Sequence, residues 1–130
     1  MPDLAHMMTP AATLPQDGTS GVLAGRVWRP DAGGPSVVAV RADGVVDLSR
    51  LAPTMRDLCE RDDAVEIVRS GAGEPLGPLE AILTNTPEAT RDPKQPWLLT
   101  PIDLQAVKAA GVTFARSMVE RVIEEQARGA

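Results

Sequence analysis

The sequence predicts an α+β fold, in which a small and mostly β N-terminal region precedes a C-terminal helix. Three short apolar segments bounded by Gly, Pro or Asp lie within residues 21–50, a pattern typical of β-strands. Residues 115–128 instead repeat apolar side chains at helical spacing, which favours an amphipathic helix. Of the 130 residues, 43% are hydrophobic and 24% charged, which is a globular balance.

The first twenty residues contain three prolines and no sustained apolar period. Such a segment has little apolar surface to bury, whereas ordering a backbone costs about 1–2 kcal/mol per residue. We therefore expect a disordered tail over residues 1–20.

A small β-rich domain is expected over residues 21–85. Its predicted strands are residues 22–29, 36–41 and 45–48. Asp43 and Gly44 separate the last two strands, and both residue types accept positive φ at low cost. This turn makes the hairpin the best-defined local feature of the sequence.

A short helix is predicted over residues 53–60, because Met55, Leu58 and Cys59 recur at positions i, i+3 and i+4. Cys59 lies on the apolar side of that helix, and no histidine is near enough in the chain to activate it. We therefore expect Cys59 to be a small buried hydrophobic residue.

The remainder of the β-rich domain is less clearly patterned. Residues 64–69 and 79–83 fit either a strand or a short helix, and residues 70–78 resemble a Gly/Pro loop. Three prolines in the next segment indicate a linker over residues 86–97. A short extended stretch is expected over residues 109–114.

The strongest helix pattern in the chain lies at its C-terminal end. An apolar stripe runs along it, flanked by charged residues, and Glu124 and Arg128 form a favourable i, i+4 pair. The stripe consists of Met118, Val119, Val122 and Ile123. Because such a stripe requires a partner surface, we expect homo-oligomers formed through this helix, or fraying of the helix in the isolated chain.

Composition excludes several classes of function. The net charge of −5 supplies no basic face for nucleic acid, and the chain lacks both an apolar run of membrane-spanning length and a signal peptide. Its single cysteine allows no internal disulfide, so we expect a cytoplasmic protein. The one histidine, His6, lies near the N-terminus, which argues against histidine-based catalysis from a folded core.

An acidic run over residues 57–63 matches no calcium-binding loop and indicates a solvated helix end. In the helix expected after Gly111, Ser117 and Glu120 share a face, and Arg116 lies four residues before Glu120. These polar residues fit a charged helix face in contact with solvent. From the residues alone, a solvent-exposed face is the more ordinary interpretation.

Two segments, residues 98–103 and residues 111–120, together resemble the entry to the catalytic domain of the fumarylacetoacetate hydrolase superfamily. Many members of that superfamily carry Gly-Leu-Asn-Tyr-x-x-His-x-x-Glu. This sequence keeps Gly111, an aromatic residue at Phe114 and Glu120, and has Ser117 in place of the histidine. The variant resembles the branch that contains 2-keto-3-deoxy-sugar-acid dehydratases, including those acting on 2-keto-3-deoxyarabinonate.

The resemblance implies a small N-terminal β domain followed by the first strand and helix of a truncated, mixed-β catalytic domain, with residues 98–130 as its incomplete start. It implies a metal-dependent enzyme of 2-keto acids, either dehydrating 2-keto-3-deoxy sugar acids or hydrolysing acylpyruvates. The superfamily holds Mg²⁺ or another divalent cation with a Glu-x-Glu pair and a later Asp. This chain has no Glu-x-Glu, so no metal ligand is assigned to it, and we expect it to be inactive alone.

The resemblance also implies site roles. Glu120 is the expected acid/base, and Ser117 its orienting partner or a substrate contact; Thr113 and Arg116 are expected to bind substrate. Without the histidine, a carboxylate remains to take a proton next to the keto group, which suits elimination of water better than C–C hydrolysis. The alternative is a non-catalytic module that binds another protein through its amphipathic helix.

Overall fold

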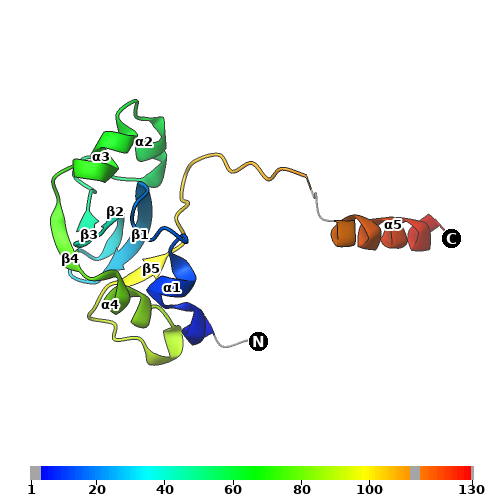
Figure 1. Ribbon diagram of the computed structural model, residues 1–130, viewed down its shortest axis with the longest axis horizontal. Helices are drawn as coiled ribbons and strands as arrows, with labels where there is room; N and C mark the ends of the chain where they lie inside the picture. The colour runs from blue at the N-terminus through cyan, green and yellow to red at the C-terminus, as the bar shows by residue number, and fades with distance from the viewer. Residues whose placement is uncertain (1–3, 112–114, 130) are drawn as a thin grey trace.

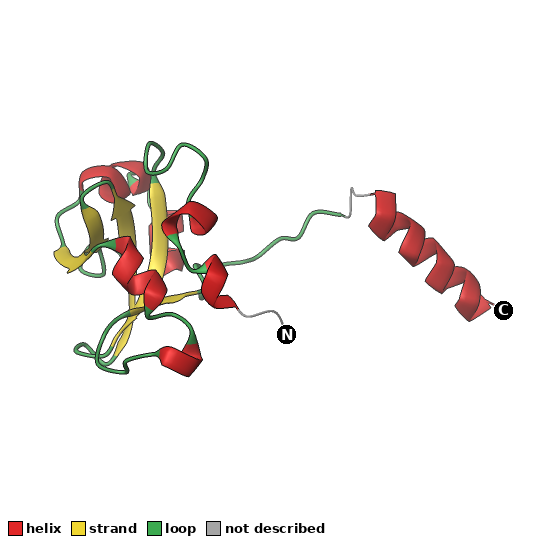
Figure 2. Ribbon diagram, turned by 60° about the horizontal axis from the view of Figure 1, so that its bottom comes forward, coloured by secondary structure: helices red, strands yellow, loops and turns green. Residues whose placement is uncertain are grey.

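The computed structural model describes residues 4–111 and 115–129. Helices lie on both faces of a five-stranded antiparallel sheet (Figures 1 and 2). The strands are β1 (Leu23–Arg29), β2 (Gly34–Arg41), β3 (Gly44–Asp47), β4 (Glu74–Gly77) and β5 (Trp97–Leu99). The α-helices are α1 (Pro10–Thr13), α2 (Met55–Glu60), α3 (Ala64–Ser70), α4 (Leu79–Thr84) and α5 (Ala115–Gly129), and the 3-10 helices are η1 (Leu4–Met7) and η2 (Glu88–Thr90). The predicted mixed α+β class is confirmed.

The order of strands across the sheet is β4-β3-β2-β1-β5. The predicted hairpin is present: Arg41 pairs with Gly44, and Ala42 and Asp43 form the turn between them. Gly44 has a φ of 132°. Every described residue with a positive φ is a glycine, so Asp43 has a negative φ. Asp43 thus does not use the positive φ expected of it.

The central strand β2 is packed on both faces, which explains its uninterrupted apolar sequence. Val37 and Ala39 contribute to a core with α2 and α3, and Val38 contributes to a core on the opposite face with α4. The first core contains Val37, Ala39, Leu48, Ala52, Met55, Leu58, Ile67 and Val68. The second contains Val27, Val38, Val45 and Ile82.

Both segments that fitted either a strand or a helix are helices, α3 and α4. Each buries two consecutive apolar residues, Ile67 and Val68 in α3 and Ile82 and Leu83 in α4. The end of α3 is held by Arg41 of β2, whose guanidinium donates hydrogen bonds of 2.8–3.3 Å to three carbonyl oxygens of residues 67–71. A cation at the last carbonyls stabilises a helix C-terminus.

The expected loop over residues 70–78 contains the edge strand β4, which pairs with β3. Pro75 argued against a strand in the sequence, because proline cannot donate a ladder hydrogen bond. It is accepted in β4 because β4 lies at the edge of the sheet. Gly73 precedes β4, and a Cβ atom there would lie 1.9 Å from the carbonyl oxygen of Asp47. The close approach of these two backbones therefore requires glycine.

The expected linker over residues 86–97 is folded against the sheet. The Asn85 side-chain amide donates hydrogen bonds to the carbonyl oxygens of Asp92, Gln95 and Pro96 at 3.0–3.1 Å. Trp97 stacks on Trp28, with ring centroids 6.1 Å apart. Because β5 pairs with β1, residues 97–99 belong to the same sheet as the first strands.

The N-terminal segment also differs from the expected disordered tail. The hydroxyl of Thr9 accepts a hydrogen bond from the Ala12 amide, and Pro10 occupies the first turn of α1. Both features are typical of a helix start. Helix α1 lies beside α4 (Figure 1). This tertiary contact stabilises a segment whose own sequence has no sustained apolar period.

Figure 1 shows α5 apart from the sheet, at the end of an extended segment. Residues 109–111 of the expected extended stretch have no regular structure, and residues 112–114 lie outside the described part of the chain. No helix within the described ranges is long and apolar enough to cross a bilayer.

Candidate functional site

Three of the four residues predicted to carry chemistry belong to α5. Glu120 is exposed in this helix, and the backbone of Ser117 lies one helical turn before it. Arg116 also belongs to the first turn of α5, whereas Thr113 lies outside the described residues. The helix thus provides the predicted i, i+3 spacing of Ser117 and Glu120.

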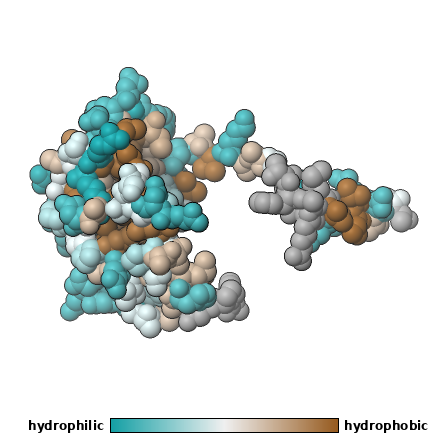
Figure 3. All heavy atoms as spheres, in the orientation of Figure 1, coloured by the Kyte–Doolittle hydropathy of each residue, from teal (hydrophilic) through white to brown (hydrophobic). Residues whose placement is uncertain are grey.

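The apolar stripe of α5 is largely exposed. Val119, Val122 and Ile123 retain 56%, 51% and 61% of their accessible surface, and Figure 3 shows a hydrophobic patch between hydrophilic side chains on this helix. Apolar exposure of this kind on a well-formed helix marks a surface that gains stability when covered.

Carboxylates of the described residues do not gather into a metal site. No group of three His, Cys, Asp or Glu side chains within residues 4–111 and 115–129 has metal-binding geometry. In the acidic run, Asp57 forms a capping box with Thr54, Glu60 pairs with Arg56 at 3.1 Å and Asp63 pairs with Arg61 at 2.8 Å. The run therefore caps and flanks helices, as a solvated helix end does.

A dense group of charges surrounds Arg29 at the end of β1, and no local pattern in the sequence indicated it. Its guanidinium donates to Asp47 at 2.7 Å, to Glu74 at 2.9 Å and to both carboxylate oxygens of Asp31 at 2.6 and 3.2 Å. Arg29 and Asp47 are both buried, with 8% and 6% of their surfaces exposed. The cluster joins the β1–β2 turn to the ends of β3 and β4.

Hydrogen bonding decides the ionisation of this cluster. Burial opposes ionisation of Asp47, but hydrogen bonds involving Ser49, Arg29 and Ser36 outweigh it and place the pKa of Asp47 below its usual value. The hydrogen bonds that Arg29 donates to the carboxylates of Asp31 and Asp47 raise the pKa of its guanidinium above its ordinary value. Each of the three guanidinium nitrogens donates to a side-chain carboxylate of the chain itself, so we assign the cluster a structural role.

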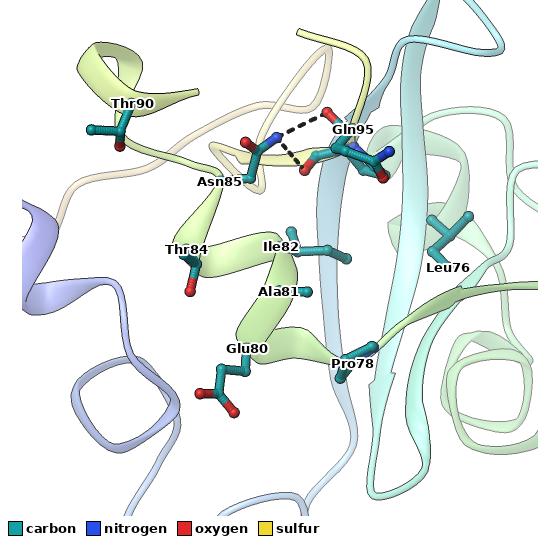
Figure 4. A pocket seen from close by; sticks show the side chains of 10 residues that line it. Leu76, Pro78, Glu80, Ala81, Ile82, Thr84, Asn85, Thr90 and Gln95 are labelled. Carbon is teal, nitrogen blue, oxygen red and sulfur yellow. Dashed lines mark hydrogen bonds between the residues drawn. The ribbon is translucent and has the colours of Figure 1, made fainter. Parts of the chain in front are cut away.

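A cavity of about 620 Å³ lies beside α4. Figure 4 shows the Asn85 amide directed at the backbone of Gln95, to which it is hydrogen-bonded. Of its lining side chains, Glu80 alone carries a charge. The cavity thus combines apolar walls with an amide that the fold already uses, and it offers no paired acid and base.

Cys59 is exposed, which corrects the expectation that it is buried. Helix α2 is only six residues long and buries Met55 and Leu58. Met55 and Leu58 face the core of the sheet, and Cys59 lies outside that contact.

Comparisons of the chain with protein-family models, with curated proteins and with solved structures find no match.

Proposed function

We propose that this chain is the N-terminal part of a metal-dependent, fumarylacetoacetate hydrolase-like enzyme acting on 2-keto acids. The observation that carries the proposal is the Gly-Val-Thr-Phe-x-x-Ser-x-x-Glu motif over residues 111–120, together with the exposed apolar stripe of α5. The motif supplies an acid/base, and the stripe supplies a surface that a further sheet would cover.

Dehydration of 2-keto-3-deoxy sugar acids is the reaction that the residues favour over hydrolysis of acylpyruvates. The Glu120 carboxylate takes a proton from the carbon between the ketone and the hydroxyl-bearing carbon. The electron pair released then expels the hydroxyl group, which leaves as water after protonation. Ser117 orients Glu120 or contacts the substrate, and Arg116 and Thr113 are assigned to substrate binding.

The divalent cation of such an enzyme supplies polarisation of the keto group. The described residues of this chain do not fit such an ion, because their acidic side chains are dispersed among helix caps and ion pairs. The proposal therefore assigns the ligands of the ion to a further part of the enzyme.

Activity assays with 2-keto-3-deoxy sugar acids and acylpyruvates test the proposal. We expect no turnover by the 130-residue chain with Mg²⁺, and metal-dependent turnover by the longer product if the reading frame continues past codon 130. In that longer protein, Glu120→Gln lowers kcat by about 10²–10⁴-fold. Glu124→Gln, one turn further along the same helix, is the matched control and retains activity.

Turnover by the 130-residue chain itself would contradict its assignment as a non-catalytic part, and wild-type rates for Glu120→Gln would remove Glu120 from the mechanism. The second candidate is a non-catalytic interaction module, which the exposed stripe of α5 also favours. A stop codon after residue 130, together with loss of partner binding or self-association in Val122→Ser, would support that module.

A further inference from the structure

The chain does not leave the folded body where its last strand ends. After β5 it continues alongside the body toward the end occupied by α2 before turning away to α5 (Figure 1). Along this path Arg26 of β1 holds the backbone: its Nη1 atom donates to the carbonyl oxygens of Thr100 at 3.1 Å and Ile102 at 2.9 Å. One side chain thus binds two carbonyls located more than 70 residues later in the sequence.

Asp103 makes the next contact, on α2. Its carboxylate accepts hydrogen bonds from the backbone amides of Met55 at 2.7 Å and Arg56 at 3.1 Å, while Thr54 accepts from the amide of Asp57 at 3.0 Å. The first amides of a helix have no partner within it. In α2, Thr54 binds one of these amides and the distant Asp103 binds two others.

The two contacts form one unit, because Arg26 Nε lies 3.5 Å from Asp103 Oδ2. The side chains retain 16% and 12% of their accessible surface. Burial opposes ionisation of Asp103, but the amides of Leu104, Met55 and Arg56 and the charge of Arg26 outweigh it and lower its pKa.

We infer that Arg26 and Asp103 form a clamp that fixes residues 100–104 on the folded body and sets Leu104 as the point from which the chain departs toward α5. The inference is independent of the proposed function. With the clamp closed, the ten residues 105–114 separate α5 from the body and span at most about 35 Å. Opening the clamp adds residues 100–104 and extends the reach to about 50 Å.

The lone cysteine provides a direct test in the full chain. Cys59 is exposed on α2, one turn from the amides that Asp103 binds, so a nitroxide attached there broadens the NMR amide signals of residues nearby. We expect strong broadening of Ile102 and Leu104 in the otherwise unaltered chain. In Asp103→Asn and in Arg26→Gln we expect that broadening to fall several-fold.

Thr54→Ala is the matched control, since it removes the local cap of α2 and leaves the clamp in place; broadening of Ile102 and Leu104 should persist. Unchanged amide signals in β2 and β3 verify that each variant is folded. Undiminished broadening in either Asp103→Asn or Arg26→Gln, or its equal loss in Thr54→Ala, would overturn the clamp.

Discussion

Among individual side chains, Arg29 holds the ends of several elements together. It joins the β1–β2 turn, β3 and β4 through Asp31, Asp47 and Glu74. The contacts differ in weight, because Asp47 is buried whereas the side chains of Asp31 and Glu74 are about 65% and 63% exposed. Exposed ion pairs contribute little to stability, so the pair with Asp47 dominates.

Arg29→Met is expected to lower the free energy of unfolding by about 3 kcal/mol, since it leaves the buried Asp47 carboxylate without its cation. Urea denaturation at pH 7 measures this change. Arg50→Met, which alters an exposed arginine three residues after Asp47, is the control and should change stability by less than about 0.5 kcal/mol.

The sign of the pH dependence follows from the lowered pKa of Asp47. A carboxylate with a depressed folded-state pKa stabilises the fold above its unfolded pKa of about 3.9, and that contribution is lost as the pH falls through the folded value. The difference in free energy of unfolding between the unaltered chain and Arg29→Met should therefore narrow as the pH falls from about 5 to 2. A constant difference over that range would contradict the ion pair.

At the scale of elements, the β2–β3 hairpin depends on Gly44 for two separate reasons. Its φ of 132° is unfavourable for other residues. A Cβ atom there would also lie 2.9 Å from the carbonyl oxygen of Gly77 in β4, so a side chain would push the edge strand away from β3.

We expect Gly44→Val to destabilise the protein by about 1 kcal/mol or more, measured by urea denaturation. Gly21→Val is the matched control, because a Cβ at Gly21 meets nothing within 4 Å and its φ is not positive. Equal stabilities of the two variants would show that neither the turn geometry nor the contact with β4 matters.

At the scale of the whole molecule, the sheet with its two cores is distinct from α5. The described core residues all lie between residues 27 and 83, and β5 and residues 100–104 close the body around them. The stripe of α5, by contrast, is exposed. Stability of the body should therefore be insensitive to the chain that follows Leu104.

Two shortened chains test this division. A chain ending at Leu104 should melt at the same temperature as the full chain. A chain ending at Leu99 loses the Asp103 cap of α2, worth about 1 kcal/mol, and should melt about 4–8 °C lower. A lower melting temperature for the chain ending at Leu104 would show instead that α5 packs on the body.

Local sequence patterns were sufficient to predict the α+β class, the strands β1, β2 and β3, the helices α2 and α5 and the glycine at the β2–β3 turn. These features follow from local periodicity and turn chemistry, which are properties of neighbouring residues. The same local logic placed Ser117 and Glu120 one turn apart, because helical spacing alone fixes that relation.

Contacts between distant parts of the chain were needed to establish that residues 64–70 are helical, that β4 and β5 are strands, and that residues 4–20 are ordered. Tertiary structure also decided the partners of Arg29, Arg26 and Asp103, which lie 18 to 76 residues away for the contacts that cross the fold. Burial against the sheet overrides weak local preference, and a charged side chain in a sequence does not indicate which distant group it will meet. Cys59 illustrates the same limit, because its exposure depends on the narrow contact that a six-residue helix makes with the sheet.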